Sequence, residues 1–418
     1  MIRKTTLKAL SAAFAAVMLL SGCNNNSEQG TVTGANTSAG DVSEAANDVP
    51  VAELKGTGAE IPKFDFEAQP LPESEALSFV QNLKLGWNLG NTLDATQKTS
   101  VDTASEMSWG APKTTENMIL SIKNAGFNTI RVPVTWHNHV DENNKITDEW
   151  LARVKEVVDY GYKNGMYVIL NIHHDTDKNY FYPTKEAFEQ SKKFVTDIWT
   201  QVAEVFKDYD EHLIFECMNE PRLIGTDKEW WVDVNSAEGK EAIDCIMQTN
   251  QAFVDLVRAS GGNNAQRYLM VPSYCASPDF ACADLFELPN DSANRIIVSA
   301  HSYEPYDFAL SDDLSKNTFS ERTGKSIDSK LSALYNKFVS KGIPVVIGEF
   351  GSRNKNDNTE ARIQHAAFYS AKAKSYGIPC VWWDNNAFSG NGELFGLYNR
   401  KEGTWTYPDI VLALMENY

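Results

Sequence analysis

The chain has 418 residues, 42% hydrophobic and 22% charged, a composition typical of globular proteins that excludes a disordered or fibrous chain. The formal net charge of −18 repels phosphate backbones, so it argues against nucleic acid as a partner. A neutral polymer is not excluded, and 10 Trp, 16 Tyr and 20 Phe suit a protein that stacks on flat surfaces.

The N-terminal residues have the features of an export signal. Basic residues precede an apolar run at 9–20 that is too short to span a bilayer. Leu20-Ser21-Gly22-Cys23 follows and looks like a bacterial lipobox, in which Cys23 is lipidated and becomes the mature N-terminus. We expect residues 1–22 to be a lipoprotein signal peptide, and the protein to be extracytoplasmic and lipid-anchored to a bacterial membrane or cell surface. The alternative is an ordinary secretory signal in which Cys23 occurs by chance.

Residues 23–70 are rich in Asn, Ser, Gly, Thr, Ala and acidic residues, with scattered apolar ones. Such a segment buries too little apolar surface to fold by itself. We therefore expect a disordered linker that separates the anchor from one folded domain over residues 71–418.

Within residues 71–418, short apolar runs alternate with longer amphipathic stretches. Helices are predicted at 115–125, 147–164, 185–208, 239–260, 328–341 and 358–376, and strands at 83–89, 129–134, 167–172, 213–216, 268–272, 296–301, 344–349 and 380–384. Strands that alternate with helices form parallel sheets, and eight such units predict an α/β fold, the (β/α)8 TIM barrel. An open doubly wound sheet is disfavoured because 86–91 lacks the glycine spacing of a dinucleotide-binding turn.

Five cysteines follow Cys23, at positions 217, 245, 275, 282 and 380. Because their number is odd, at least one thiol stays free. Cys275 and Cys282 could form a disulfide across one loop, although thiols in a large core are usually small buried apolar groups. No spacing of Cys or His indicates zinc.

Polar residues gather where the predicted strands end, which is where barrel enzymes carry out their chemistry. Glu220 follows the fourth predicted strand and Glu349 ends the seventh, and these two strands face each other across the mouth of a barrel. Two carboxyl groups that flank a sugar–sugar bond are the minimum requirement for glycoside hydrolysis. One must donate a proton and the other must be ionised, so their environments must differ.

The motifs at these strand ends resemble glycoside hydrolase family 5, the cellulase family A, over about residues 83–385. The motifs that carry the resemblance are, in chain order, Arg131, His173, Asn219-Glu220-Pro221, His301-x-Tyr303, Gly348-Glu349-Phe350-Gly351 and Trp383. The stretches Gly86-Trp87-Asn88-Leu89-Gly90-Asn91-Thr92 and Trp383-Asp384-Asn385 are most similar to the endoglucanase and xyloglucanase branch, subfamily 4.

The resemblance implies roles for the two carboxyl groups. Glu220 would be the general acid and then the base, and Glu349 the nucleophile of a retaining mechanism, with the groups about 5–5.5 Å apart. Asn219 would bind the sugar 2-hydroxyl. We expect the pKa of Glu220 to be raised.

Other matched residues would support these carboxyl groups. Arg131 would hold Glu349 ionised, while the residues alone leave open a structural pairing of Arg131 with Glu216, or both. Tyr303 would donate a hydrogen bond to the nucleophile, and His301 would orient the acid/base.

The reacting sugar would lie against His173 and Trp383. His174 would be either a second sugar contact or a packed histidine. Because adjacent strand residues point to opposite faces, His173 and His174 are not expected to bind one metal ion, and no metal or cofactor is expected. Further sugar platforms could come from loop aromatics at Trp109, Trp136, Tyr180, Tyr182, Trp230 and Trp231.

Taken with the resemblance, the sequence predicts a monomeric retaining endo-β-1,4-glucanase with a β-glucan polysaccharide as substrate. Alternatives on the same site are xyloglucanase, mixed-linkage glucanase, xylanase and mannanase. A surface glycan-binding lipoprotein would be expected to lack one carboxylate. A solute-binding lipoprotein of a transporter would be expected to have two lobes.

Overall fold

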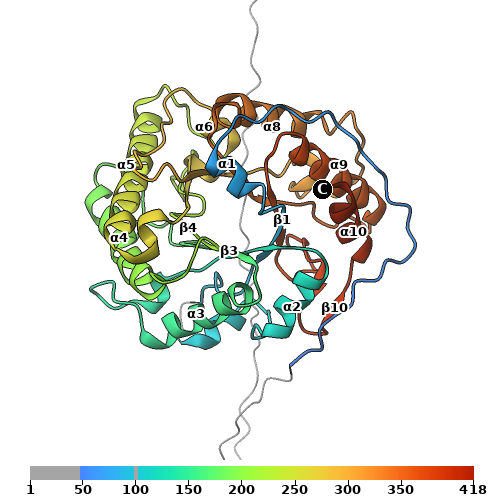
Figure 1. The fold of residues 1–418 in the computed structure, drawn as a ribbon, viewed down its shortest axis with the longest axis horizontal. Helices are drawn as coiled ribbons and strands as arrows, with labels where there is room; N and C mark the ends of the chain where they lie inside the picture. Colours follow the sequence, from blue (N-terminus) through green and yellow to red (C-terminus); the bar gives the residue numbers. More distant parts are fainter. Residues whose placement is uncertain (1–47, 98–101) are drawn as a thin grey trace, which may run out of the picture. The chain divides into compact units, whose positions relative to one another are not determined.

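The computed structural model describes residues 48–97 and 102–418. The predicted signal peptide, Cys23 and the linker up to residue 47 lie outside the described residues. Eight parallel strands form one closed barrel in the order β1 to β8, surrounded by helices (Figure 1), so the predicted (β/α)8 fold is confirmed. In the described part of the chain, no helix is both long and apolar enough to cross a membrane.

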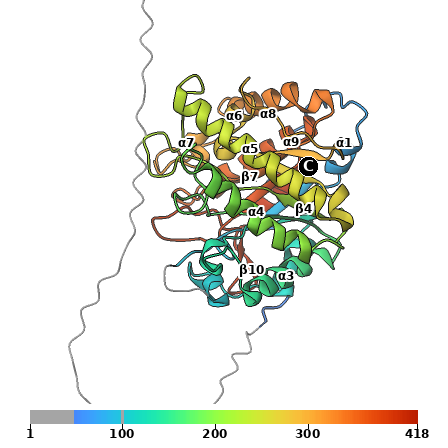
Figure 2. The same cartoon turned by 90° about the vertical axis from the view of Figure 1, so that its left-hand side faces the viewer.

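The elements lie close to their predicted positions. The barrel strands are β1 (Leu85–Leu89), β2 (Thr129–Val132), β3 (Tyr167–Asn171), β4 (Leu213–Glu216), β5 (Leu269–Pro272), β6 (Ile296–His301), β7 (Val345–Phe350) and β8 (Cys380–Asp384). The longer helices are α2 (Glu116–Asn124), α3 (Asp148–Tyr162), α4 (Phe188–Val205), α5 (Ala237–Ala259), α8 (Lys325–Lys337), α9 (Thr359–Ser375) and α10 (Pro408–Asn417). Figure 2 shows α4 and α5 side by side on the outside of the barrel.

Short elements complete the fold. They are α1 (Glu75–Val80), α6 (Pro278–Ala281), α7 (Tyr306–Ala309), the hairpin of β9 (Tyr398–Asn399) and β10 (Thr404–Trp405), and five 3-10 turns at Thr103–Met107, His137–His139, Gly262–Gln266, Tyr274–Ala276 and Val339–Lys341. The last turn takes up the end of the helix predicted to reach residue 341.

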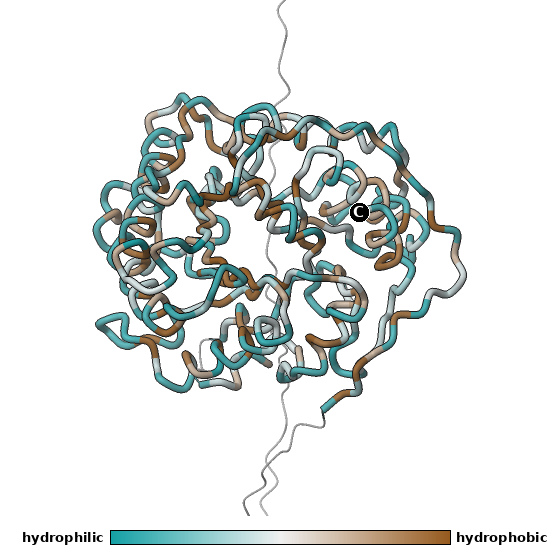
Figure 3. Tube along the Cα trace, in the orientation of Figure 1, coloured by the Kyte–Doolittle hydropathy of each residue, from teal (hydrophilic) through white to brown (hydrophobic). Residues whose placement is uncertain are grey.

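Helix α1 closes the amino-terminal end of the barrel. Its side chains pack on inward-facing residues of the strands, and Phe79 stacks on Tyr268 with ring centroids 3.6 Å apart. The strands are buried on both faces and form the hydrophobic centre of Figure 3. Because apolar side chains fill this end, the polar side chains of the barrel interior gather at the carboxyl ends of the strands.

Residues 48–70 differ from the expected disordered linker. They lie along α9 and α10, on the right of Figure 1. The backbone N–H of Phe64 donates to Asn417 at 2.9 Å, and the rings of Phe64 and Phe66 pack edge-on against Phe368. The helices therefore supply the apolar contact that the segment cannot make with itself, and the folded unit includes these residues.

The cysteines at 217, 245, 275, 282 and 380 are all free thiols. The disulfide considered between Cys275 and Cys282 is not formed. Burial raises the pKa of the Cys275 and Cys282 thiols, as expected for small groups packed in or near a core.

Candidate active site

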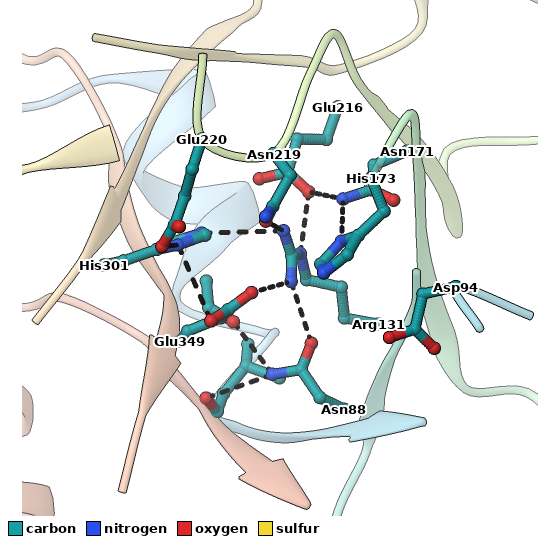
Figure 4. A network of polar contacts seen from close by, with 12 residues as sticks. Asn88, Asp94, Arg131, Asn171, His173, Glu216, Asn219, Glu220, His301 and Glu349 are labelled. Carbon is teal, nitrogen blue, oxygen red and sulfur yellow. Dashed lines mark hydrogen bonds and ion pairs between the residues drawn. The ribbon is translucent and has the colours of Figure 1, made fainter. Parts of the chain in front are cut away.

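Glu220 and Glu349 converge at the carboxyl ends of the strands (Figure 4). Glu349 belongs to β7, and Glu220 lies in the loop after β4. One carboxylate oxygen of each and a ring nitrogen of His301 all lie within 4.8 Å of one another. This separation fits the retaining arrangement of two carboxyl groups and is too short for the water-filled gap of an inverting enzyme.

The guanidinium of Arg131 connects most of the polar groups in this centre. Its Nη1 donates to Oε1 of Glu349 at 2.7 Å and to Oδ1 of Asn88 at 3.0 Å. Its Nη2 donates to Oδ1 of Asn219 at 2.7 Å, and its Nε donates to Oε2 of Glu216 at 2.7 Å. Arg131 therefore serves both carboxylates, which settles the alternatives that its sequence position left open.

Two carboxylates keep the buried Arg131 charged. Burial alone would lower the pKa of its guanidinium, but the charges of Glu216 and Glu349 outweigh burial and raise the pKa above its ordinary value. Glu216 is fully buried and also accepts from Ser299 at 2.5 Å and from Asn171 at 3.1 Å. Every member of this network has partners, as a buried ion pair requires.

Glu349, the nucleophile candidate, accepts hydrogen bonds from two side chains. Besides Arg131, the hydroxyl of Tyr303 donates to Oε2 of Glu349 at 2.8 Å, as expected. A carboxylate restrained in this way keeps one geometry and is ready to attack a carbon above it. Since Arg131 donates to Oδ1 of Asn219, the amide NH2 of Asn219 is the group that can donate to a substrate hydroxyl.

The pKa of Glu220, the acid/base candidate, is shifted in the direction opposite to the expected one. Burial raises the pKa of Glu220, but the hydrogen bond and charge of His301, followed by the charges of Arg222 and Arg131, outweigh burial and lower it. Nδ1 of His301 lies 2.8 Å from Glu220 and 3.7 Å from Glu349. The expected raised pKa of Glu220 is therefore wrong for the free enzyme.

In contrast to Glu220, His301 has a pKa above its ordinary value. Burial lowers the pKa of His301, but the charge of Glu349 and the hydrogen bond with Glu220 raise it above its ordinary value. The two opposite shifts favour the histidine over Glu220 as the holder of the pair's one proton, which can pass between them along a single hydrogen bond. A register shift between β6 and β7 after Ala300 places His301 opposite Glu349.

The aromatic floor of the site is formed by Trp383 and His173. Their rings are parallel within 2°, with centroids 5.7 Å apart. The amide of Asn171 donates to Nδ1 of His173 at 3.1 Å, and burial lowers the pKa of this histidine, so it is neutral with its proton on Nε2. His173 can therefore donate one hydrogen bond to a sugar.

His174 lies beside His173, contrary to the expectation. The strand ends at Asn171, so the alternation of side chains stops before the two histidines, and their rings meet edge-to-face at 4.4 Å. One potential ligand atom from each of Asp94, His173 and His174 lies within 4.8 Å of the other two. Asp94 and His173 are labelled in Figure 4. The geometric reason for expecting no shared metal ion is therefore wrong, and the absence of a metal stays a prediction.

The loop aromatics fall into two groups. Trp136 and Tyr182 are buried, and Tyr180 stacks on His137. Trp109, Trp230 and Trp231 are 42%, 49% and 63% exposed, so these three remain candidates for sugar platforms.

Several site residues were missed from the sequence. Asn88, a polar residue within a buried strand, accepts from Arg131 and donates to the carbonyl of Gly348 at 2.9 Å. The sequence did indicate a special role for Asn88, because it is a polar residue within an otherwise apolar strand. Burial, followed by the charges of Glu220 and Glu349, raises the pKa of the Glu393 carboxyl; the position of Glu393 in a loop gave no indication of this in the sequence.

Two carboxyl groups at this distance are the arrangement of a retaining glycoside hydrolase, and here one is held by a cation and the other by a histidine. The family model for cellulase (glycosyl hydrolase family 5) matches residues 93–389. The chain belongs to glycoside hydrolase family 5.

Individual relatives agree with this family. The chain is 46% identical over 365 residues to endoglucanase A of Clostridium longisporum, covering 86% of this chain and 69% of that one. The structure of a family 5 lichenase from Caldicellulosiruptor sp. F32 matches with TM-score 0.84 and 51% identity, over 86% of this chain and 99% of that one. A GH5-4 broad specificity endoglucanase from Ruminococcus champanellensis matches with TM-score 0.77 and 45% identity, over 83% and 100% of the chains.

Proposed function

We propose that this protein is a retaining endo-β-1,4-glucanase that cleaves internal bonds of β-glucan chains. The observation that carries the proposal is the approach of Glu220, His301 and Glu349 within 4.8 Å at the mouth of the barrel. The endoglucanase and lichenase names of the relatives point to the same substrate class.

The geometry supports a double displacement. Glu349 attacks the anomeric carbon while Glu220 transfers its proton to the oxygen of the leaving sugar, so the C–O bond breaks as the glycosyl-enzyme forms. Glu220, now a base, then takes a proton from water as the water oxygen attacks the same carbon and releases Glu349. The side-chain NH2 of Asn219 can donate to the 2-hydroxyl in both transition states.

The charge of His301 changes during the reaction. When Glu349 becomes an ester it loses its negative charge, which is the largest influence raising the pKa of His301. By then the one proton of the Glu220–His301 pair has passed to the leaving sugar, so His301 is neutral and Glu220 is a carboxylate. Glu220 takes the next proton from the attacking water, which restores the proton of the pair for the next turnover.

We also propose that the mature protein begins at Cys23 and is lipid-anchored at a bacterial membrane or cell surface, acting as a monomer. The basic and apolar residues before Leu20-Ser21-Gly22-Cys23 support this location. The residues between Cys23 and the packed segment at 48–70 would separate the barrel from the anchor.

The test is reducing-end release by purified residues 24–418 on carboxymethyl cellulose, mixed-linkage β-glucan, tamarind xyloglucan, xylan and glucomannan. Activity on the glucans that is lost in Glu349→Gln is expected. The order of rates also decides between endoglucanase, mixed-linkage glucanase and xyloglucanase. Binding to these glucans without reducing-end release would instead support the surface glycan-binding alternative.

A further inference from the structure

The loop after Glu220 carries a charged and aromatic group that the mechanism above does not use. Nη1 of Arg222 donates to the main-chain oxygen of Glu220 at 2.9 Å and lies 3.6 Å from its carboxylate. Nε of Arg222 lies 3.3 Å from Oε1 of Glu229. The guanidinium also lies over the ring of Trp230, 4.2 Å from its centroid.

This loop is held in one shape by contacts of its own. The second oxygen of Glu229 accepts the N–H of Gly225 at 2.9 Å. The hydroxyl of Tyr274 accepts the N–H of Leu223 at 3.0 Å and donates to the carbonyl of Lys228 at 2.7 Å. Arg222 and Trp230 are thus fixed relative to the acid/base, as a preorganised subsite requires.

The ring of Trp230 has a buried cation against one face, yet the residue is 49% exposed. A sugar ring binds to such an open aromatic surface through its C–H groups. The acid/base transfers its proton to the oxygen of the leaving sugar, so a platform tied to Glu220 lies on the leaving-group side of the bond that breaks.

We propose that Trp230 is a platform for the leaving-group sugars and that Arg222 is a positioning residue that ties this platform to the acid/base carboxyl. The inference rests on the proposed glucanase function and deepens it. It assigns the side of the cleft that recognises the part of the β-glucan chain released first.

The positive charge of Arg222 makes the proposal testable by a second measurement, the pH dependence of the reaction. The cations around Glu220 are His301, Arg131 and Arg222. Among the anions, Glu349 lies within 4.8 Å of Glu220, Glu229 pairs with Arg222, and Glu393 interacts with Glu220 through its charge. The positive charges of Arg131 and Arg222, which lie outside the Glu220–His301 pair, make that pair release its proton at lower pH. Loss of the Arg222 charge should therefore move the basic limb of the pH–rate profile to higher pH.

The first experiment compares Trp230→Ala with Trp231→Ala, a neighbouring exposed tryptophan that packs on Phe280 instead. For Trp230→Ala we expect kcat/KM on cellopentaose to fall about tenfold, and kcat/KM on 2,4-dinitrophenyl β-cellobioside to change by less than about twofold. Trp230→Phe keeps a flat ring and should recover most of the loss. Trp231→Ala should lose less activity on cellopentaose than Trp230→Ala does, because the ring of Trp231 packs on Phe280 and not on Arg222. Equal losses on both substrates, or an equal loss in Trp231→Ala, would overturn the platform.

The second experiment uses Arg222→Gln and Arg222→Lys. We expect Arg222→Gln to shift the basic limb of kcat/KM on cellopentaose upward by about half a pH unit or more, and Arg222→Lys to restore the limb because it keeps the charge. An unchanged limb in Arg222→Gln would overturn the positioning role.

Different results would reject the proposed glucanase function and the proposed leaving-group platform. If the wild type cleaves no glucan, the proposed function fails. If the wild type cleaves cellopentaose and Trp230→Ala cleaves it equally well, only the leaving-group platform fails.

Discussion

Arg131 and Glu349 form a 2.7 Å ion pair between β2 and β7, with side chains that are 0% and 7% exposed. In that environment Arg131 is the cation that contacts the carboxylate of Glu349 most closely, and Glu349 shares it with the fully buried Glu216. The same guanidinium also orients Asn219, so one residue sets the charge and position of the groups that meet the sugar.

Replacement of Arg131 should therefore harm both stability and activity. In Arg131→Gln, two buried carboxylates lose their counter-ion, which we expect to lower the free energy of unfolding by about 3–5 kcal/mol. Chemical denaturation with far-UV circular dichroism measures this change. A loss below about 1 kcal/mol, at the level of an exposed ion pair, would show that the network does not depend on Arg131.

Glu220→Gln should separate substrates by the quality of their leaving group. An amide cannot donate the proton that a sugar leaving group needs, so turnover of β-glucan should fall by about 10³-fold or more. Dinitrophenyl cellobioside needs little protonation, so the formation of its glycosyl-enzyme should be largely spared, which a burst of dinitrophenol in stopped-flow absorbance would report. Equal losses on both substrates would reject Glu220 as the acid.

The pH dependence should reveal the Glu220–His301 pair. Because the pKa of His301 is raised, the pair keeps its proton above the ordinary range of histidine, and activity should be lost only as the pH rises through that elevated value. In His301→Gln the carboxyl alone must hold the proton, so the basic limb should move to lower pH. The pH profile of kcat/KM measures this, and a basic limb that stays in place would show that the histidine only orients the acid.

Gly90 should be required for the floor of the site. A Cβ at this position would lie 2.8 Å from the ring of Trp383, so Gly90→Ala must displace the platform. We expect KM on cello-oligosaccharides to rise by about tenfold with a smaller change in thermal stability. Gly392→Ala is the matched control, because a Cβ there meets nothing within 4 Å. A wild-type KM in Gly90→Ala would remove Trp383 from substrate binding.

Cys23→Ala should release the protein from membranes. Acyl chains contribute about 0.8 kcal/mol per buried CH2, and loss of the thiol removes the attachment point. Fractionation of cells that express the full chain, with immunoblotting of the soluble and membrane fractions, measures the change. Membrane association that persists in Cys23→Ala would reject the lipid anchor.

The sequence by itself determined the architecture and the two catalytic candidates. Consecutive apolar residues such as Val345, Val346 and Ile347 form strands buried on both faces, a local property that needs no knowledge of neighbours. Glu220 and Glu349 were recognisable because each lies in a short motif at the carboxyl end of such a strand, Glu220 just after β4 and Glu349 within the last residues of β7. The carboxyl ends of the strands then had to bring the two side chains to one end of the barrel.

Only the tertiary structure decided which neighbours these residues meet. Residues 48–70 pack because Phe368 and Asn417, hundreds of positions away, supply a surface that the segment's composition does not reveal. The lowered pKa of Glu220 arises from His301 and Arg222 in the folded site, since electrostatic effects follow distance through space. For the same reason, the pairing of Arg131 with both carboxylates could not be read from the order of residues along the chain.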